Sequence, residues 1–221
     1  VVRQVVPVCR VLFLTLVSIA CLWAADFQSG DLYYNITGNN TVEVASADAN
    51  IVSANIPSSV THNGTTYSVT GVHESAFKAC KYLTTAVIPN SVTSVGAGVF
   101  YGCSALESVV LSNKITALPS TSGRVPNGFF HQCKALKSIV IPNSVKTIGK
   151  NAFNNCTALA TITIGTGVTE IGDNAMKYCI FAKKNFINNS SLNAEANGYW
   201  GARIVDDEID GMIILHDSII D

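Results

Sequence analysis

One short motif recurs at nearly equal intervals along the chain. It consists of a large apolar residue, two variable residues and a cysteine, and neighbouring cysteines are spaced by 23, 30, 23 and 23 positions. The copies are Phe77–Cys80, Phe100–Cys103, Phe130–Cys133, Phe153–Cys156 and Met176–Cys179. A period near 23 residues indicates that one small structural unit has been copied and stacked, so the sequence predicts a solenoid.

The remainder of the unit follows the same period. The copy from Leu136 to Cys156 begins with Leu-x-x-Ile-x-Ile, in which apolar residues alternate with polar or small ones, and Pro142 follows at once. This alternation predicts a half-buried strand, and proline ends it because proline has no N–H for a strand ladder. Ala-Phe-x-x-Cys, with apolar groups three residues apart, predicts a single helical turn. One unit cannot bury enough apolar surface to fold alone, so neighbouring units must share a core.

Two hairpins are predicted near the N-terminus. An irregular first copy begins at Ile51 and carries extra residues around Asn63–Gly64, a two-residue turn signal between β-prone segments. Residues 26–50 are polar and rich in turn residues, with Leu32–Ile36 and Thr41–Val44 as strand candidates. We expect this second hairpin to cover the open core of the first copy.

The cysteines of the motif allow three interpretations. We predict a buried, reduced ladder, because each cysteine follows a large apolar residue by three positions and free cysteine packs as a small hydrophobe. Two disulfides and one free thiol remain an alternative in an exported protein. A metal site is disfavoured, since no two cysteines form a C-x-x-C pair and the nearest histidine, His131, has no partner set. We therefore expect no metal and no cofactor; the redox state of the ladder (Cys80, Cys103, Cys133, Cys156 and Cys179) stays open.

The first 25 residues have the form of a secretory signal peptide. Arg3 and Arg10 precede the apolar run Val11–Trp23, and small residues follow it. The run is shorter than the roughly 20 apolar residues that a membrane span needs. A lipoprotein signal with Cys21 as the lipidated residue is the alternative, and it would be the one link to a membrane. Both interpretations predict a secreted or cell-surface protein.

The consensus I-P-N-S-V-x-x-I-G-x-x-A-F-x-x-C-x-x-L resembles the leucine-rich repeat of BspA-like, treponemal-type proteins, over roughly residues 51–179. The resemblance implies a leucine-rich repeat solenoid: a curved, right-handed, β-rich coil with a parallel strand ladder on its concave face and short helical turns on its convex side. It also implies a bacterial protein that is secreted or exposed on the surface. Some BspA-like proteins are adhesins that bind host matrix proteins or other cells.

These patterns divide the chain into four parts. After Cys179 the repeat frame breaks, and the chain ends within the apolar segments Met212–Leu215 and Ser218–Ile220, which favour a hairpin followed by further repeats in a longer protein. The expected parts are a signal peptide (1–25), an N-terminal β-hairpin cap (26–50), leucine-rich repeats (51–182) and an insertion with a β-hairpin (183–221).

The low content of charged residues disfavours one class of partner, nucleic acids. Only 13% of the residues are charged and the net charge is −1, so no basic excess exists to neutralise a nucleic acid. Stacking would set the outward strand residues in parallel rows, a broad face that suits an extended protein or glycan ligand better than a small molecule. We therefore predict adhesion or protein–protein interaction through this face; the sequence indicates no oligomeric state. The predicted binding residues are Thr85, Val87, Ser108, Val110, Ser138, Val140, Thr161 and Thr163.

Other functions have weaker support. The histidines fall at unrelated points of the repeat and form no catalytic set, so we do not predict an enzyme. A spacer that presents a missing C-terminal domain is one alternative. A glycan-binding module is another, with Tyr199–Trp200 either stacking on a sugar or anchoring the insertion to the solenoid. The acidic cluster of Asp206, Asp207, Glu208 and Asp210 matches no calcium-loop spacing and favours a solvated turn.

Overall fold

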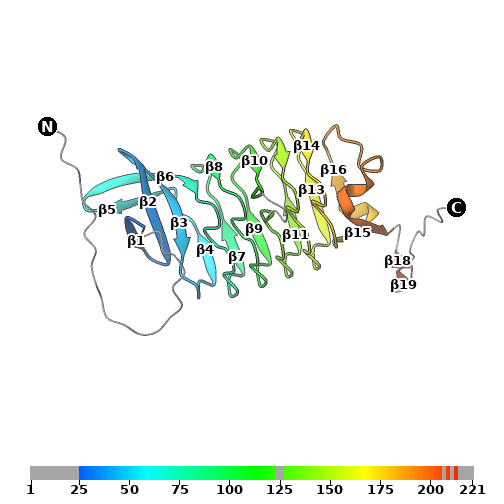
Figure 1. The fold of residues 1–221 in the computed structure, drawn as a ribbon, viewed down its shortest axis with the longest axis horizontal. Helices are drawn as coiled ribbons and strands as arrows, with labels where there is room; N and C mark the ends of the chain where they lie inside the picture. Colours follow the sequence, from blue (N-terminus) through cyan, green and yellow to red (C-terminus); the bar gives the residue numbers. More distant parts are fainter. Residues whose placement is uncertain (1–24, 123–126, 206–207, 210–211, 214–221) are drawn as a thin grey trace.

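The computed structural model describes residues 25–122, 127–205, 208–209 and 212–213, which form an elongated stack of coils (Figure 1). The predicted signal peptide, with Cys21, lies outside these residues, as does most of the acidic cluster and of the C-terminal hairpin. In the described part of that region, Glu208–Ile209 (β18) pairs antiparallel with Met212–Ile213 (β19).

Parallel strands from successive coils form a long stack, as the alternating repeat segments predict. Two three-stranded sheets make up this first stack. The strands are β4 (Ser53–Asn55), β7 (Thr85–Val87) and β9 (Ser108–Val110), then β11 (Ser138–Val140), β13 (Thr161–Ile164) and β16 (Phe186–Asn188). Equivalent repeat positions face each other, so that Ser108 pairs with Thr85 and Thr161 pairs with Ser138. The prediction of a leucine-rich repeat solenoid with a parallel strand ladder is confirmed.

A second stack of two-residue strands runs along the same axis (Figure 1). It contains β10 (Ala117–Leu118), β12 (Thr147–Ile148) and β14 (Glu170–Ile171), which pair in parallel. The glycines that follow β12 and β14 are needed for close approach of the coils. A Cβ on Gly149 would lie 2.8 Å from the backbone nitrogen of Ser120, and one on Gly172 would lie 2.6 Å from that of Lys150. Every larger residue would therefore push the coils apart.

A sheet with mixed pairing covers the first coil. Its order is β1 (Phe27–Ser29), β2 (Leu32–Gly38), β3 (Thr41–Ala47), β6 (Thr65–Val72) and β5 (Ser59–His62). β2 and β3 pair antiparallel, and so do β5 and β6 around Asn63–Gly64, where both residues have positive φ, as a two-residue hairpin turn requires.

The strand β6 joins this sheet to the solenoid. It pairs in parallel with β3 on one side and with β8 (Ser94–Val95) on the other. Tyr34, Val42 and Val44 are fully buried beneath the sheet. Hydrogen bonds and apolar packing are therefore continuous from the N-terminal hairpin into the repeats.

The Phe-x-x-Cys segments are single hydrogen-bonded turns at the positions where the sequence predicts short helical turns, and none of them extends into a regular helix. In each turn the cysteine N–H donates to the carbonyl of the large apolar residue three positions earlier, as from Cys80 to Phe77 at 3.1 Å. The residue before each cysteine has positive φ, from 59° to 75°. A left-handed residue ends helical geometry after one turn. These residues are Ala79, Gly102, Gln132, Asn155 and Tyr178.

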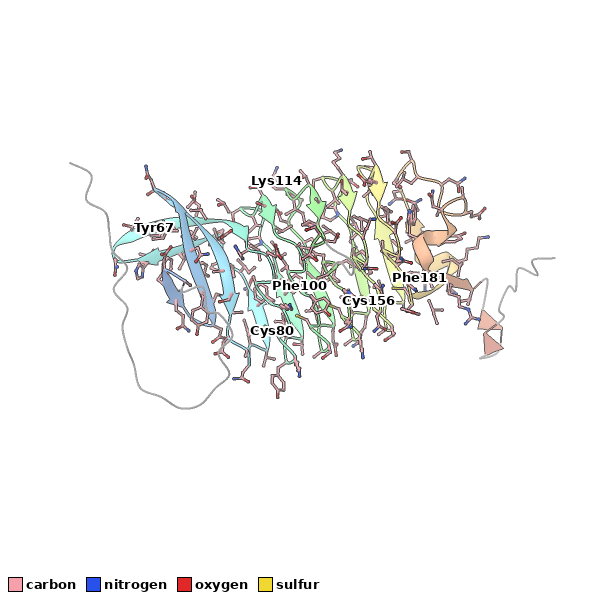
Figure 2. All side chains as sticks on the ribbon, in the orientation of Figure 1. Tyr67, Cys80, Phe100, Lys114, Cys156 and Phe181 are labelled. Atoms are coloured by element: carbon pink, nitrogen blue, oxygen red, sulfur yellow. The ribbon has the colours of Figure 1, made fainter. Side chains whose placement is uncertain are left out.

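The core is a column of stacked rings beside a column of thiols. Phe77, Phe100, Phe130 and Phe153 stack in order, with ring centroids 5.3, 5.5 and 5.3 Å apart. All four are fully buried, and Figure 2 marks Phe100 and Cys156 among these interior side chains. The five motif cysteines are buried and free, as the core-ladder interpretation predicts.

The segment predicted as an insertion supplies a further, irregular coil. Phe186 of β16 pairs with Ile162, so β16 continues the first stack. Ile180–Ala182 (β15) pairs in parallel with Arg203–Val205 (β17). The backbone carbonyl of Trp200 accepts a hydrogen bond from the N–H of Met176 at 3.1 Å. The only helical pieces here are the 3-10 turns η1 (Lys183–Asn185) and η2 (Gly198–Gly201) among the described residues. None of the helices in that part of the chain has the length and hydrophobicity to cross a bilayer.

Candidate functional site

The outer face of the first stack brings the predicted binding residues together in two rows. The polar row contains Thr85, Ser108, Ser138 and Thr161, and the valine row contains Val87, Val110, Val140 and Thr163. We call the two rows together the strand strip. Between β9 and β11, where no strand ladder forms, the backbone N–H of Lys137 donates to the carbonyl of Glu107 at 3.2 Å and keeps the two sheets in line.

The valine row is unusually exposed for apolar side chains on a parallel sheet. Val87, Val110 and Val140 are 37%, 60% and 65% accessible. Ile187 pairs with Thr163 and is 42% accessible, so it extends the row by one coil. The sequence did not point to Ile187, because the repeat frame is lost after Cys179 and the pairing of β16 depends on three-dimensional contacts.

Polar groups border the valine row on one side. The hydroxyls of Ser53 and Thr85 lie 2.9 Å apart within the extended polar row. Beyond them, the ammonium of Lys137 lies 2.6 Å from the carboxylate of Glu107, and both side chains are at least half exposed. The strand strip is thus an apolar row edged by hydroxyls and one balanced ion pair, with little net charge.

The interior cysteines are unsuited to nucleophilic chemistry. Burial raises the pKa of Cys80 to about 11 and that of Cys179 to about 12. Burial also holds the pKa of Cys133 and Cys156 well above the usual range of a thiol. Since the thiolate is the reactive form, these groups stay protonated and inert at neutral pH.

The histidines and the aromatic pair do not form the sites that their residue types suggest. Within the described ranges, no three histidine, cysteine, aspartate or glutamate side chains are grouped as metal ligands. Trp200 is only 7% accessible, so its ring packs into the last coil instead of offering a face to a sugar. Tyr199 makes an edge contact with Phe186, with centroids 5.3 Å apart. The pair therefore anchors this segment to the solenoid.

The sequence and the fold are similar to those of bacterial repeat proteins. The family model of the BspA type leucine-rich repeat region matches residues 46–122 and 123–198, in six copies. A leucine-rich repeat protein from Bacteroides ovatus is 34% identical, with a TM-score of 0.63; the match covers 77% of this chain and 42% of that one. A leucine-rich repeat protein from Bacteroides capillosus is 33% identical, with a TM-score of 0.53, over 62% of this chain and 96% of that one.

A more distant relative shares the fold. The leucine-rich repeat protein of T. pallidum is 24% identical, with a TM-score of 0.57, over 69% of this chain and 68% of that one. None of the curated proteins matches this chain. The chain spans less than half the length of the Bacteroides ovatus protein.

Proposed function

The chain belongs to the BspA-type leucine-rich repeat family, and on that premise we propose that it binds an extended protein partner along the strand strip. The partner would be a host matrix protein or a protein on another cell, and the role would be adhesion. The protein would be bacterial and either secreted or held at the cell surface. The sequence of residues 1–25, with its signal-peptide form, supports export.

The single observation that carries this proposal is the exposed valine row. Val110 and Val140, at 60% and 65% accessible, lie on adjacent strands of one face, with Val87 and Ile187 in the same row. Paired strands lie about 4.8 Å apart, and Val87, Val110 and Val140 stand on three successive coils as one apolar line, with Thr163 between Val140 and Ile187. A contiguous exposed apolar patch on a monomer commonly marks an interaction site.

The strand strip favours a particular mode of contact. Central strands of the stack already pair through their backbones on both sides, as β7 does with β4 and β9. A partner therefore cannot add a strand there and must contact the outward side chains. An extended segment that lies along the coil axis would cover the valine row with apolar groups and meet the hydroxyls of the polar row.

The test is binding of the purified protein to immobilised matrix proteins, measured by biolayer interferometry. Val110→Arg combined with Val140→Arg should reduce binding at least tenfold, since two charges would interrupt the apolar row. Ser94→Arg is the matched control, because Ser94 is an exposed strand residue of β8, which lies outside the strand strip. Unchanged binding of the double variant, or an equal loss in the control, would count decisively against the strand strip.

A further inference from the structure

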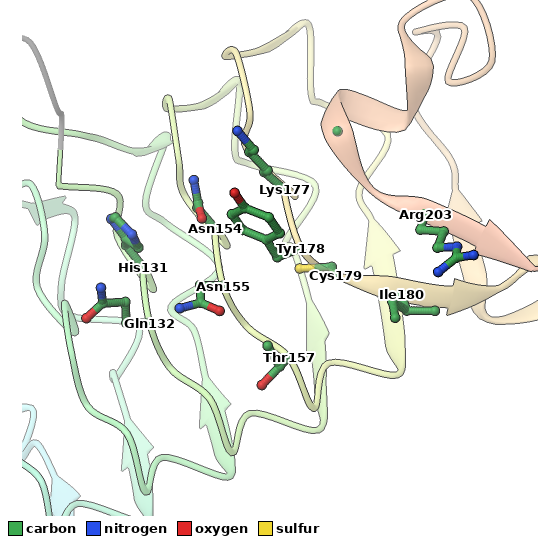
Figure 3. A pocket seen from close by; sticks show the side chains of 11 residues that line it. His131, Gln132, Asn154, Asn155, Thr157, Lys177, Tyr178, Cys179, Ile180 and Arg203 are labelled. Atoms are coloured by element: carbon green, nitrogen blue, oxygen red, sulfur yellow. The ribbon is translucent and has the colours of Figure 1, made fainter.

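A groove lies on the turn side of the solenoid, away from the strand strip. It has a volume of about 880 Å³ and is lined by turns of neighbouring coils (Figure 3). This volume falls within the range of pockets that hold small ligands, roughly 300–1,000 Å³. The groove is therefore large enough for a short chain of sugar-sized units.

The floor of the groove is built from the variable positions of the Phe-x-x-Cys motif. Three successive copies place their two variable residues beside one another. These pairs are His131 and Gln132, Asn154 and Asn155, and Lys177 and Tyr178. The fixed residues of the motif turn inward and build the core, so the two variable positions are free to carry a ligand-specific surface.

The groove has a net positive charge. Lys177 and Arg203 line it, and none of the described lining residues carries a carboxylate. The side-chain amides of Gln132, Asn154 and Asn155 also line the groove. An amide offers both a donor and an acceptor, and a guanidinium pairs well with a planar carboxylate.

Tyr178 presents an exposed aromatic ring from a strained position. Its ring is 61% accessible and extends toward the side of Asn154 and Asn155 (Figure 3). The Lys177 ammonium lies 5.1 Å from the ring centroid. The φ angle of Tyr178 is 68°. The equivalent positions of two earlier copies hold Gly102 and Asn155, residue types that adopt positive φ with less backbone strain than tyrosine does. A bulky residue kept at a left-handed position points to a role for its side chain.

His131 supplies an independent sign of a ligand. The side chain is 9% accessible, lines the groove, and its Nδ1 has no hydrogen-bond partner. The ring is held in place by an edge contact with Tyr101, with centroids 5.2 Å apart. A buried polar atom without a partner is costly; Nδ1 is screened from solvent, so a rotation of the ring that turns it into the groove would let a ligand hydroxyl remove that cost.

We propose that this groove binds an acidic oligosaccharide, with one uronic acid carboxylate at Lys177, another at Arg203, and a sugar ring on the face of Tyr178. Gln132, Asn155 and His131 then meet sugar hydroxyls. This site is separate from the strand strip and does not depend on a protein partner there.

A saccharide suits the groove better than an acidic peptide does. The backbone N–H groups of these turns already bond to the next coil, as from Gln132 to Asn154 at 2.9 Å and from Asn155 to Lys177 at 2.8 Å. A peptide that pairs through its main chain would therefore find these two N–H groups already taken. The available groups are an aromatic face, amides and cations, which match the apolar ring faces, hydroxyls and carboxylates of an acidic sugar.

The experiment is isothermal titration calorimetry of the purified protein with trigalacturonic acid and with a hyaluronan tetrasaccharide. At least one of these should bind, and a neutral galactose trisaccharide should bind at least tenfold more weakly. Tyr178→Asn should weaken binding at least tenfold without lowering the melting temperature, because asparagine tolerates the left-handed backbone better than tyrosine does. Lys177→Gln combined with Arg203→Gln should have the same effect on binding.

Two matched controls lie outside the groove. Tyr82→Asn removes a tyrosine that is also 61% accessible, and Lys146→Gln removes an exposed cation. Neither should change binding. The proposal is wrong if neither acidic saccharide saturates the protein at millimolar concentration, if Tyr178→Asn binds as the wild type does, or if a hexaglutamate peptide binds as tightly as the saccharides.

Discussion

The thiol of Cys156 donates a hydrogen bond to the backbone carbonyl of Phe130, one coil earlier, at 3.1 Å. That carbonyl also accepts the N–H of Cys133 at 3.0 Å, so it serves its own turn and the next coil at once. The same thiol contact joins the other central coils, at 2.9, 3.1 and 3.2 Å. The Phe-x-x-Cys spacing therefore positions a hydrogen bond between neighbouring coils as well as the packing of side chains within one coil.

Removing one of these thiols should destabilise the whole stack. Cys156→Ala deletes the sulfur from a fully buried site and leaves the Phe130 carbonyl with one donor fewer, so we expect the free energy of unfolding to fall by about 2 kcal/mol. Urea denaturation followed by circular dichroism measures it. Cys156→Ser, which keeps a donor, should lose less, and Thr157→Ala on the exposed neighbour should change little. A loss under about 0.5 kcal/mol for Cys156→Ala would show that the contact is unimportant.

The buried thiols should also make stability depend on alkaline pH. Their folded pKa values are raised above the usual 9.0 of a thiol, by burial first, to about 11 for Cys80 and about 12 for Cys179. The unfolded chain therefore loses these protons first, and the stabilisation that is complete below pH 9 is lost as the pH rises toward the folded values. The free energy of unfolding should therefore stay constant up to about pH 8 and fall as the pH rises from 9 toward 11 and 12. A chain with Cys156→Val should show a smaller drop than the wild type, and equal drops would contradict this origin.

Chemical labelling should distinguish the reduced ladder from disulfides. In native protein, iodoacetamide should modify the five motif cysteines slowly, with Cys80 first because it alone among them is measurably accessible, at 5%. After unfolding without reductant, mass spectrometry should find all five modified. Finding only one of the five modified would mean that two disulfides exist and that the ladder interpretation is wrong.

The left-handed position before each cysteine should respond to glycine in a predictable direction. Gly102→Ala should cost about 1 kcal/mol, and the cost would be backbone strain, because the new Cβ would meet no atom closer than 3.8 Å. Ala79→Gly, at the equivalent position with φ of 59°, should stabilise by up to about 1 kcal/mol. Thermal melts of both variants measure the effect. Shifts of the same sign in the two variants would be incompatible with this explanation.

Much of the fold follows from sequence periodicity. Residues that recur every 23 positions must share one environment, and Phe100, Ile139 and Cys156 all lie in the core as their frame predicts. Asn63–Gly64 likewise forms the turn that its chemistry favours. The strand strip was found in the same way, because alternation along a strand decides which side chains face outward.

The remainder depends on contacts that a sequence does not display. Ala79, Gln132 and Tyr178 carry no signal for a left-handed backbone, so the sequence does not show that the predicted helical turn ends there. Asn143 accepts the N–H of Thr166 from the next coil at 2.9 Å, a contact visible only once the coils are stacked. The sequence left two roles open for Trp200, stacking on a sugar or anchoring the segment. The burial of its ring depends on how the last coil folds back.

The Phe carbonyl and the Cys thiol give each of the three central copies one acceptor for its successor and one donor for its predecessor. A gene that gains or loses one whole 23-residue copy would reproduce the same junction at the new neighbour. Recombination between copies can therefore lengthen or shorten the strand strip and the opposite row of turns in single-coil steps. Selection on the length of the solenoid and selection on its folding would then act on different residues of the same motif.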